Sequence, residues 1–296
     1  MHVVFVVPGC RSRRFAVNVT QLGDALDTLF QHASRPLHVD VLMAGRHPSN
    51  GDVVTLLECL RPSMRQGVSA VVDLFQLQPG KGKLKVMNIT LRKSHRGTSN
   101  ESQHRFLFPL CTSLHRLLRV DRVLLLAPEV RFHYDVSFLW AQFEQFPAEA
   151  VFGLAREQSP RYARTLKHRR GVAPKQGGCG DPPTVGGNPG LNGAVALLNL
   201  EGMRQSREYS RLYSEIDDIA EKYGWYGGPL ADRDFYTMAS CQLPALLHLL
   251  PCAWNRQVPA RHKAPVASRD GAVRAGGLYR WCEGGVYACS AHCPAD

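Results

Sequence analysis

The run VDRVLLL at residues 120–126 constrains the fold of this chain more than any other segment. A strand that is apolar at every successive position is typical of the interior of a parallel sheet, because helices then cover both of its faces. In such sheets, ligands bind beyond the carboxyl ends of the strands. The run is followed by Ala127, Pro128 and Glu129, so these three residues are expected at a ligand site.

Apolar periodicity predicts the rest of an α/β fold around that strand. Residues 2–7 and 37–45 are predicted strands, and apolar residues at helical spacing predict a helix near 20–32 between them, which makes a βαβ unit. Residues 159–190 are rich in Gly, Pro and basic residues and lack periodicity, which predicts a flexible basic loop. We also expect strands at 86–91, 146–157 and 192–203, a strand or helix at 69–77, and a helix at 105–118.

Composition and charge indicate a globular protein with no nucleic-acid partner. The 296 residues are 44% hydrophobic, enough for one large α/β domain spanning 1–296. The formal charge of +11 is compatible with nucleic acid, an anionic surface or a phosphorylated ligand. The basic residues gather only at 161–175, without a groove-binding or base-stacking motif, so this run is interpreted as a solvated loop.

Cysteines and glycosylation sequons favour the secretory pathway. Four of the nine cysteines lie in the last 45 residues, at a spacing unlike that of a structural zinc site, which predicts disulfides in this tail. The sequons at Asn18, Asn88 and Asn100 favour the same compartment. The opening run VVFVV is too short for a signal peptide or a membrane span. The sequence is therefore expected either to be cytosolic or to lack its N-terminal anchor.

Several segments in the last two thirds of the chain carry a family resemblance. The chain resembles the xyloside α-1,3-xylosyltransferases of glycosyltransferase family 8, which are retaining, manganese-dependent enzymes. The segments are LLLAPEVRF (124–132), AVFGLARE (150–157), PGLNGAVALLNLEGMRQSREYSRL (189–212), AEKYGWYGGPLADRDFYTM (220–238), LLHLLPCAWNRQ (246–257) and YRWCEGGVYACS (279–290).

The resemblance implies a GT-A fold and a donor sugar. The fold would be a Rossmann-like mixed sheet flanked by helices, with a nucleotide-binding half at 1–130 and an acceptor-binding half at 131–296. The implied reaction transfers xylose from UDP-xylose to O-linked xylosyl-glucose on EGF-like repeats, in the lumen of the endoplasmic reticulum or Golgi, by a type II membrane protein. UDP would lie near residues 127–131.

The resemblance also locates a manganese site that this chain alters. Where the family has Asp-x-Asp, the chain has Ala127, Pro128 and Glu129, and Ala288 follows Tyr287 where the family has a metal-binding His. Glu129 is the only aligned ligand left, and it is equally well interpreted as a strand-end residue in a turn. One carboxylate is a weak site for Mn²⁺.

Sugar-binding positions are also partly altered. Where the family has a Gln below the anomeric carbon of the sugar, the chain has Arg233. The flanking Asp232 and Asp234 either bind donor hydroxyls or supply negative charge at a helix N-terminus. Asn192 matches a donor-contacting Asn. Trp254 and Asn255 match residues that shape the acceptor pocket. Cys252 and Cys282 match family cysteines and are both expected to be disulfide-bonded, with Cys289 and Cys293 competing for the remaining partner.

Two hypotheses of different class follow from these substitutions. The first is a working xylosyltransferase in which Arg131 and Arg233 replace the metal as cations, since cationic side chains also stabilise developing phosphate charge. The second is an inactive paralogue that retains the fold and binds nucleotide, glycan or a partner protein.

Overall fold

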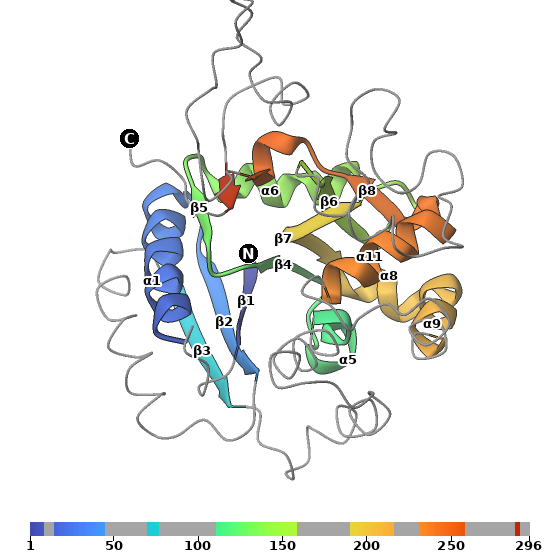
Figure 1. Ribbon diagram of the computed structural model, residues 1–296, viewed down its shortest axis with the longest axis horizontal. Coiled ribbons are helices and arrows are strands. Elements are labelled where there is room, and N and C mark those ends of the chain that lie inside the picture. The colour runs from blue at the N-terminus through green and yellow to red at the C-terminus, as the bar shows by residue number, and fades with distance from the viewer. Residues whose placement is uncertain are drawn as a thin grey trace, which may run out of the picture.

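The protein is built around a mixed seven-stranded sheet (Figure 1). The computed structural model describes residues 1–8, 15–44, 70–76, 111–158, 190–215, 231–257 and 288–290. The strand order is β3-β2-β1-β4-β7-β6-β8. The strands are β1 (His2–Pro8), β2 (Leu37–Ala44), β3 (Ala70–Gln76), β4 (Arg122–Leu126), β6 (Phe152–Arg156), β7 (Leu191–Asn199) and β8 (Leu247–Leu249).

The first half of the sheet confirms the predicted βαβ unit. Helix α1 (Phe15–His32) connects β1 to β2, and these strands are parallel with His2 opposite His38. The segment for which the sequence left two alternatives is strand β3, parallel to β2. Parallel strands need a crossover connection, and a helix is the usual one.

Strand β4 is interior, as its apolar run predicts. It pairs in parallel with β1 and antiparallel with β7, so the sheet changes from parallel to mixed at this strand. Leu124 and Leu126 pack into the cluster that contains α1, while Val123 and Leu125 pack into the cluster on the opposite face. All four are buried, which explains why the strand is apolar at every one of these positions.

Helices cover both faces of the sheet (Figure 1). Helix α1 and α6 (Val136–Ala141) pack on one face. The other face carries α5 (Leu114–Leu117), α8 (Leu200–Gln205), α9 (Arg207–Ser214) and α11 (Ala231–Gln242). Short 3₁₀ helices follow at η2 (Gln142–Gln145), η4 (Pro244–Leu246) and η5 (Cys252–Asn255). In the described parts of the chain, none of the helices is long and apolar enough to cross a membrane.

Two predicted boundaries differ from the structure. The strand predicted at 192–203 ends at Asn199, because the Asn199 side chain accepts a hydrogen bond of 2.9 Å from the Gly202 N–H and starts α8. The predicted strand at 146–157 is shorter, with β6 only at Phe152–Arg156. Of the helix predicted at 105–118, the described residues contain α5. The predicted strand at 86–91 and nearly all of the basic loop fall outside the described residues.

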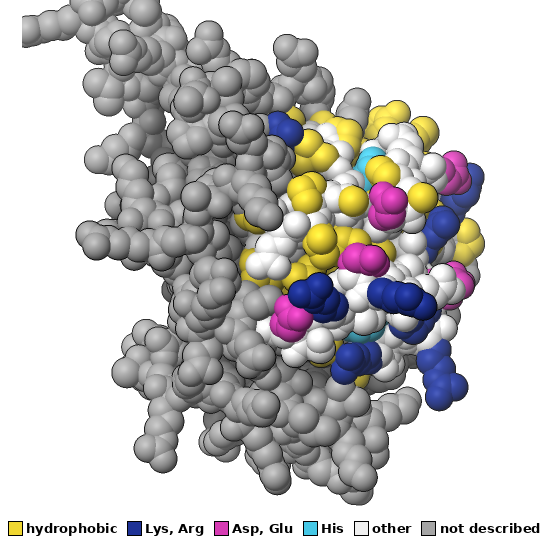
Figure 2. All heavy atoms as spheres, turned by 90° about the vertical axis from the view of Figure 1, so that its right-hand side faces the viewer, with side chains coloured by type: hydrophobic (Ala, Val, Ile, Leu, Met, Phe, Trp, Pro, Cys, Tyr) yellow, Lys and Arg dark blue, Asp and Glu magenta, His cyan; other side chains and the backbone are white. Residues whose placement is uncertain are grey.

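The face that carries α8 and α9 has mixed charge. Figure 2 shows Lys and Arg side chains gathered on this face with acidic side chains between them. The exposed basic residues include Arg204, Arg207 and Arg211, and the exposed acidic ones include Glu201 and Glu208. Opposite charges at this spacing reduce the local field.

Buried His115 makes stability depend on pH. Burial, and then the positive charge of Arg116, lowers the pKa of His115 from 6.5 to about 4. Between these values the unfolded chain binds a proton that the folded chain does not, so the free energy of unfolding falls as pH falls. At about pH 5.5 the free energy of unfolding should be lower than at neutral pH by on the order of 1 kcal/mol. His115→Phe keeps the edge-on packing against Tyr209 and Tyr213 and should remove this slope.

Urea unfolding of both proteins between about pH 7 and 5 measures the slope, with His32→Gln as a control whose curve should follow the unaltered chain. Parallel curves for the unaltered chain and His115→Phe would show that His115 does not titrate in this range.

Candidate donor-binding site at the carboxyl end of the sheet

Strand β4 ends in a tight turn that is tied to β7. The Val130 N–H donates to the Ala127 carbonyl over 3.1 Å, and the chain then continues as β5 (Val130–Phe132). The Ala127 N–H donates to the Ala194 carbonyl over 2.8 Å, which extends the β4–β7 pairing by one residue. The turn therefore holds half-buried Glu129 at the strand end where the sequence predicts a ligand.

The third altered metal position is brought to the same edge from the far end of the chain. Strand β10 (Ala288–Ser290) pairs antiparallel with β5, with Ala288 opposite Phe132 and Ser290 opposite Val130. It also pairs in parallel with β9 (Arg256–Gln257). Residue 288 therefore lies on the strand next to the one that follows Glu129.

The side chains at the three aligned positions do not supply the ligands that a manganese ion needs. Mn²⁺ takes several oxygen or imidazole ligands, whereas Ala127 and Ala288 offer only methyl groups. Glu129 is then the one side chain among the three aligned positions that can bind a cation.

Asn192 is held in a buried amide network. Its side-chain carbonyl accepts hydrogen bonds from the Ala194 N–H over 3.0 Å and from the Asn255 amide over 3.2 Å. Its own amide group donates to the Glu157 carboxylate over 3.1 Å. Asn192, Asn255 and Glu157 are 5%, 0% and 4% exposed. The structure thus brings together two predicted site residues, Asn192 and Asn255, through contacts within the protein.

Glu157 was not predicted as part of this site. It directly follows the end of β6, as Glu129 lies just beyond the end of β4. The strand-end rule that identified Glu129 could have identified Glu157 as well. The rule was not applied there, because the predicted strand at 146–157 includes Glu157 as its last residue, whereas β6 ends at Arg156.

Arg131 forms an ion pair with Asp24 of α1. Their side chains are 38% and 40% exposed, so solvent screens the pair and its contribution to stability is small. The carboxylate nevertheless offsets the charge of the guanidinium. Arg131 is therefore less suited to bind a diphosphate than a sequence-based interpretation suggests.

Asp232, Arg233 and Asp234 lie in the first turn of α11. This helix is fixed beside the start of β7, because the Leu191 N–H donates to the Thr237 hydroxyl over 3.0 Å. The carboxylates are thus at a helix N-terminus, where negative charge is favourable. Their contact with a donor sugar concerns side chains outside the described ones and stays a prediction.

An aromatic surface lies next to the predicted acceptor residues. Trp254 is buried at 3% exposure, so it packs beneath this surface on the core side and is not part of the exposed surface itself. Its ring lies 6.4 Å from that of Tyr134, which lies 5.2 Å from that of Phe138. Tyr134 and Phe138 are 44% and 53% exposed. Both rings offer apolar surface to a ligand and the Tyr134 hydroxyl adds a polar group, and no sequence motif pointed to these residues.

Cys252 is disulfide-bonded, which confirms that part of the cysteine prediction. The disulfide predicted at Cys282 stays a prediction, since Cys282 lies outside the described residues. Cys241 is also disulfide-bonded, although the sequence did not single it out. Cys111 is buried in the core, and its carbonyl accepts a hydrogen bond from the Tyr236 hydroxyl over 3.3 Å.

Comparison with known proteins agrees with this fold. No family model matches the chain. Over 156 residues, or 51% of the chain, it is 39% identical to xyloside xylosyltransferase 1 of Mus musculus and 37% identical to that of Homo sapiens. Over 153 residues it is 30% identical to xylosyl- and glucuronyltransferase LARGE1 of Homo sapiens. The matched part spans 39% of the first two relatives and 18% of the third.

Solved structures cover the chain more completely. The crystal structure of mouse xyloside xylosyltransferase 1 in its apo form superposes with a TM-score of 0.70 at 23% identity, over 99% of this chain and 98% of that one. An active-site mutant of the galactosyltransferase LgtC superposes with a TM-score of 0.57 at 15% identity, over 100% and 88% of the two chains. The chain is therefore homologous to xyloside xylosyltransferase 1 over about half its length and has the GT-A glycosyltransferase fold.

Proposed function

We propose that this chain is a UDP-xylose-dependent xylosyltransferase that binds its donor at the carboxyl end of β4 without a divalent metal. Its acceptor would be O-linked xylosyl-glucose on EGF-like repeats, in the lumen of the endoplasmic reticulum or Golgi. The observation that carries the proposal is the 39% identity to xyloside xylosyltransferase 1 over 156 residues. The position of Glu129, Asn192 and residue 288 around one end of the sheet supports it.

Without a metal, the departing diphosphate needs another source of positive charge. Arg131 is already paired with Asp24, so we assign this role to Arg233. Arg233 lies in the first turn of α11, where the unpaired N–H groups of the helix add partial positive charge. A guanidinium binds phosphate oxygens in a bidentate manner and stabilises the negative charge that develops on UDP as the sugar leaves.

The acceptor would lie over the aromatic surface of Tyr134 and Phe138. Both rings are exposed beside η5, which carries the predicted acceptor residues Trp254 and Asn255. Aromatic rings combined with a few polar groups are typical of ligand sites. In this arrangement Trp254 and Asn255 position the surface from within the core.

The inactive paralogue is the second candidate, and the buried amide network favours it. The side-chain oxygen of Asn192 already accepts two hydrogen bonds and one of its two N–H groups donates to Glu157, so within the protein most of its hydrogen-bonding capacity for a donor hydroxyl is used. The same fold would in that case bind nucleotide, glycan or a partner without transferring a sugar.

A transfer assay separates the two candidates. The purified chain is incubated with UDP-xylose, UDP-glucose or UDP-galactose and with an EGF-like repeat that carries xylosyl-glucose, either with manganese or with a chelator. Of the three donors, we expect only UDP-xylose to support transfer, and we expect the rate to be the same with manganese and with the chelator. A repeat that carries glucose only should receive no xylose. Binding of UDP without transfer from any donor would instead support the inactive paralogue.

Replacing Arg233 with Gln should weaken UDP binding by about tenfold in the metal-free protein, since a charge-assisted hydrogen bond contributes about 1.5–3 kcal/mol and part of it is screened. Arg131→Gln is the matched control and should change affinity by less than about twofold, because Asp24 already neutralises this guanidinium. Calorimetric titration with UDP in the presence of a chelator measures both. A larger effect at Arg131 than at Arg233 would reverse the assignment.

A further inference from the structure

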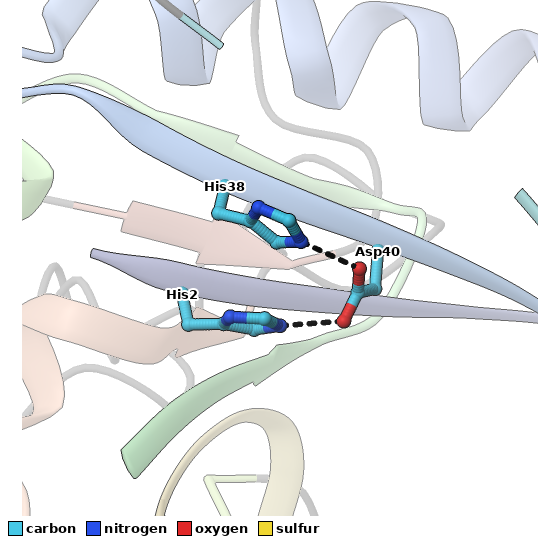
Figure 3. Close-up of side chains that lie close together, drawn as sticks. All are labelled: His2, His38 and Asp40. Atoms are coloured by element: carbon cyan, nitrogen blue, oxygen red, sulfur yellow. Dashed lines mark hydrogen bonds and ion pairs between the residues drawn. The ribbon is translucent and has the colours of Figure 1, made fainter. Parts of the chain in front are cut away.

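Two histidines and one aspartate meet at the amino-terminal ends of β1 and β2 (Figure 3). His2 and His38 are register partners in parallel strands, and their rings stack with centroids 4.4 Å apart. Asp40 lies two residues beyond His38 on the same face of β2, because side chains alternate along a strand. Both imidazoles point toward its carboxylate, with His2 Nε2 at 2.5 Å from one oxygen and His38 Nε2 at 3.1 Å from the other.

The carboxylate of Asp40 is buried at 2% exposure, whereas the side chains of His2 and His38 are 15% and 39% exposed. The register partner of Asp40 in β1 is Val4, which is fully buried in an apolar cluster. A buried carboxylate in such surroundings is costly unless a positive charge or strong hydrogen bonds offset it. Hydrogen bonds from the two imidazoles offset this cost in part, and a cation bound by all three side chains would neutralise the carboxylate directly.

We propose that His2, Asp40 and His38 form a Zn²⁺ site at this edge of the sheet. In the described parts of the chain, this is the one group of three or more potential metal-ligating side chains whose donor atoms lie close together, all within 4.8 Å. Zn²⁺ binds imidazole nitrogen and carboxylate oxygen at about 2.0–2.2 Å in tetrahedral geometry, which places donor atoms about 3.3 Å apart. Small rotations of the two rings would bring the three donors to this spacing.

The donor set selects against manganese and magnesium. Imidazole ligands suit Zn²⁺, while Mg²⁺ and Mn²⁺ prefer sites made of oxygen ligands, and sites of this type bind Zn²⁺ more tightly than Mn²⁺. Three protein ligands leave a fourth position for water, on the side where the two histidines are exposed. The site would join β1 to β2 by a bond that spans 36 residues of sequence between His2 and His38.

Zinc binding would change the tautomer of both rings. An ionised carboxylate only accepts hydrogen bonds, so each neutral imidazole must carry its proton on Nε2 when no metal is bound. Zn²⁺ takes the Nε2 lone pair, and the proton of a neutral ring then resides on Nδ1 after exchange with water. No net proton is released by a neutral ring, whereas an imidazolium would release one.

The site is separate from the proposed donor site. Parallel strands begin at one edge of a sheet and end at the other, so His2 and His38 lie at the edge opposite to Glu129. Zinc binding here requires neither UDP nor a working transferase. The two proposals can therefore fail independently.

The test is a calorimetric titration of the full chain with Zn²⁺. We expect one equivalent whose affinity falls at least about tenfold in His2→Gln and in His38→Gln, since even the loss of an outer partner of a metal ligand costs about 10–100-fold. His32→Gln, at the end of α1 and outside the cluster, is the matched control and should bind as the unaltered chain does. Mn²⁺ should not compete at equal concentration.

Nuclear magnetic resonance of the ring nitrogens gives a second readout on the unaltered chain. On zinc addition, two histidines should change from Nε2–H to Nδ1–H, and both signals should be assignable by their loss in the two Gln variants. If the rings keep Nε2–H at saturating zinc, or if both variants bind zinc as tightly as the unaltered chain, the cluster is hydrogen-bonded only and the proposal is wrong. Should a variant fail to fold by circular dichroism, the tautomer change in the unaltered chain decides.

Discussion

Replacing Ala127 and Glu129 with Asp, together with Ala288→His, is expected to make UDP binding depend on manganese, with an affinity gain of about 1–3 kcal/mol or roughly 5–150-fold. The reason is geometric. The turn after β4 carries residues 127 and 129, and β10 pairs with β5 so that residue 288 lies on the adjacent strand. Two carboxylates and an imidazole would then face the diphosphate, and a bound cation would bridge protein and ligand.

Calorimetric titration with UDP, with and without Mn²⁺, measures this gain. In the unaltered chain we expect chelation to change UDP affinity little, because only Glu129 remains at the three aligned positions. A control variant with Ala127→Asn, Glu129→Gln and Ala288→Gln adds similar volume without anionic ligands and should show no manganese effect. A strong increase of UDP affinity by manganese in the unaltered chain would contradict the conclusion that its metal site is lost.

Truncation of the central strand should cost more stability than any surface change. Leu124 and Leu125 are 0% and 4% exposed and point into the two different core clusters. Leu→Ala at such positions loses apolar burial and leaves a cavity, so each substitution should lower the free energy of unfolding by about 2–5 kcal/mol. Similar losses at both positions would follow from a strand covered by helices on both faces.

Urea unfolding measures these losses, and Leu249→Ala provides the control. Leu249 is 39% exposed on β8, which lies at the edge of the sheet, so its truncation should cost less than about 1 kcal/mol. If either Leu124→Ala or Leu125→Ala were as mild as the control, one face of β4 would be open to solvent and the sheet assignment would be incorrect.

Local patterns accounted for much of the sheet. The spacing of apolar residues identified β1, α1, β2 and β4, because burial on one or both faces requires apolar side chains at regular positions along the segment. The same rule was less accurate at the end of β7, where apolar residues continue into α8. There the cap formed by Asn199 decides where the strand ends, and this contact is not visible in periodicity.

Sequence alone determined the chemistry missing from the proposed donor edge: the side chains of Ala127 and Ala288 cannot ligate a metal in any fold, because a methyl group has no lone pair. Only the tertiary structure decided which of the remaining groups have protein partners. It pairs Arg131 with Asp24, holds Asn192 against Asn255 and Glu157, and brings the two histidines to Asp40. Most of these partners are tens of residues apart in the chain, and the strand pairing and helix packing that bring them together leave no local pattern in the sequence.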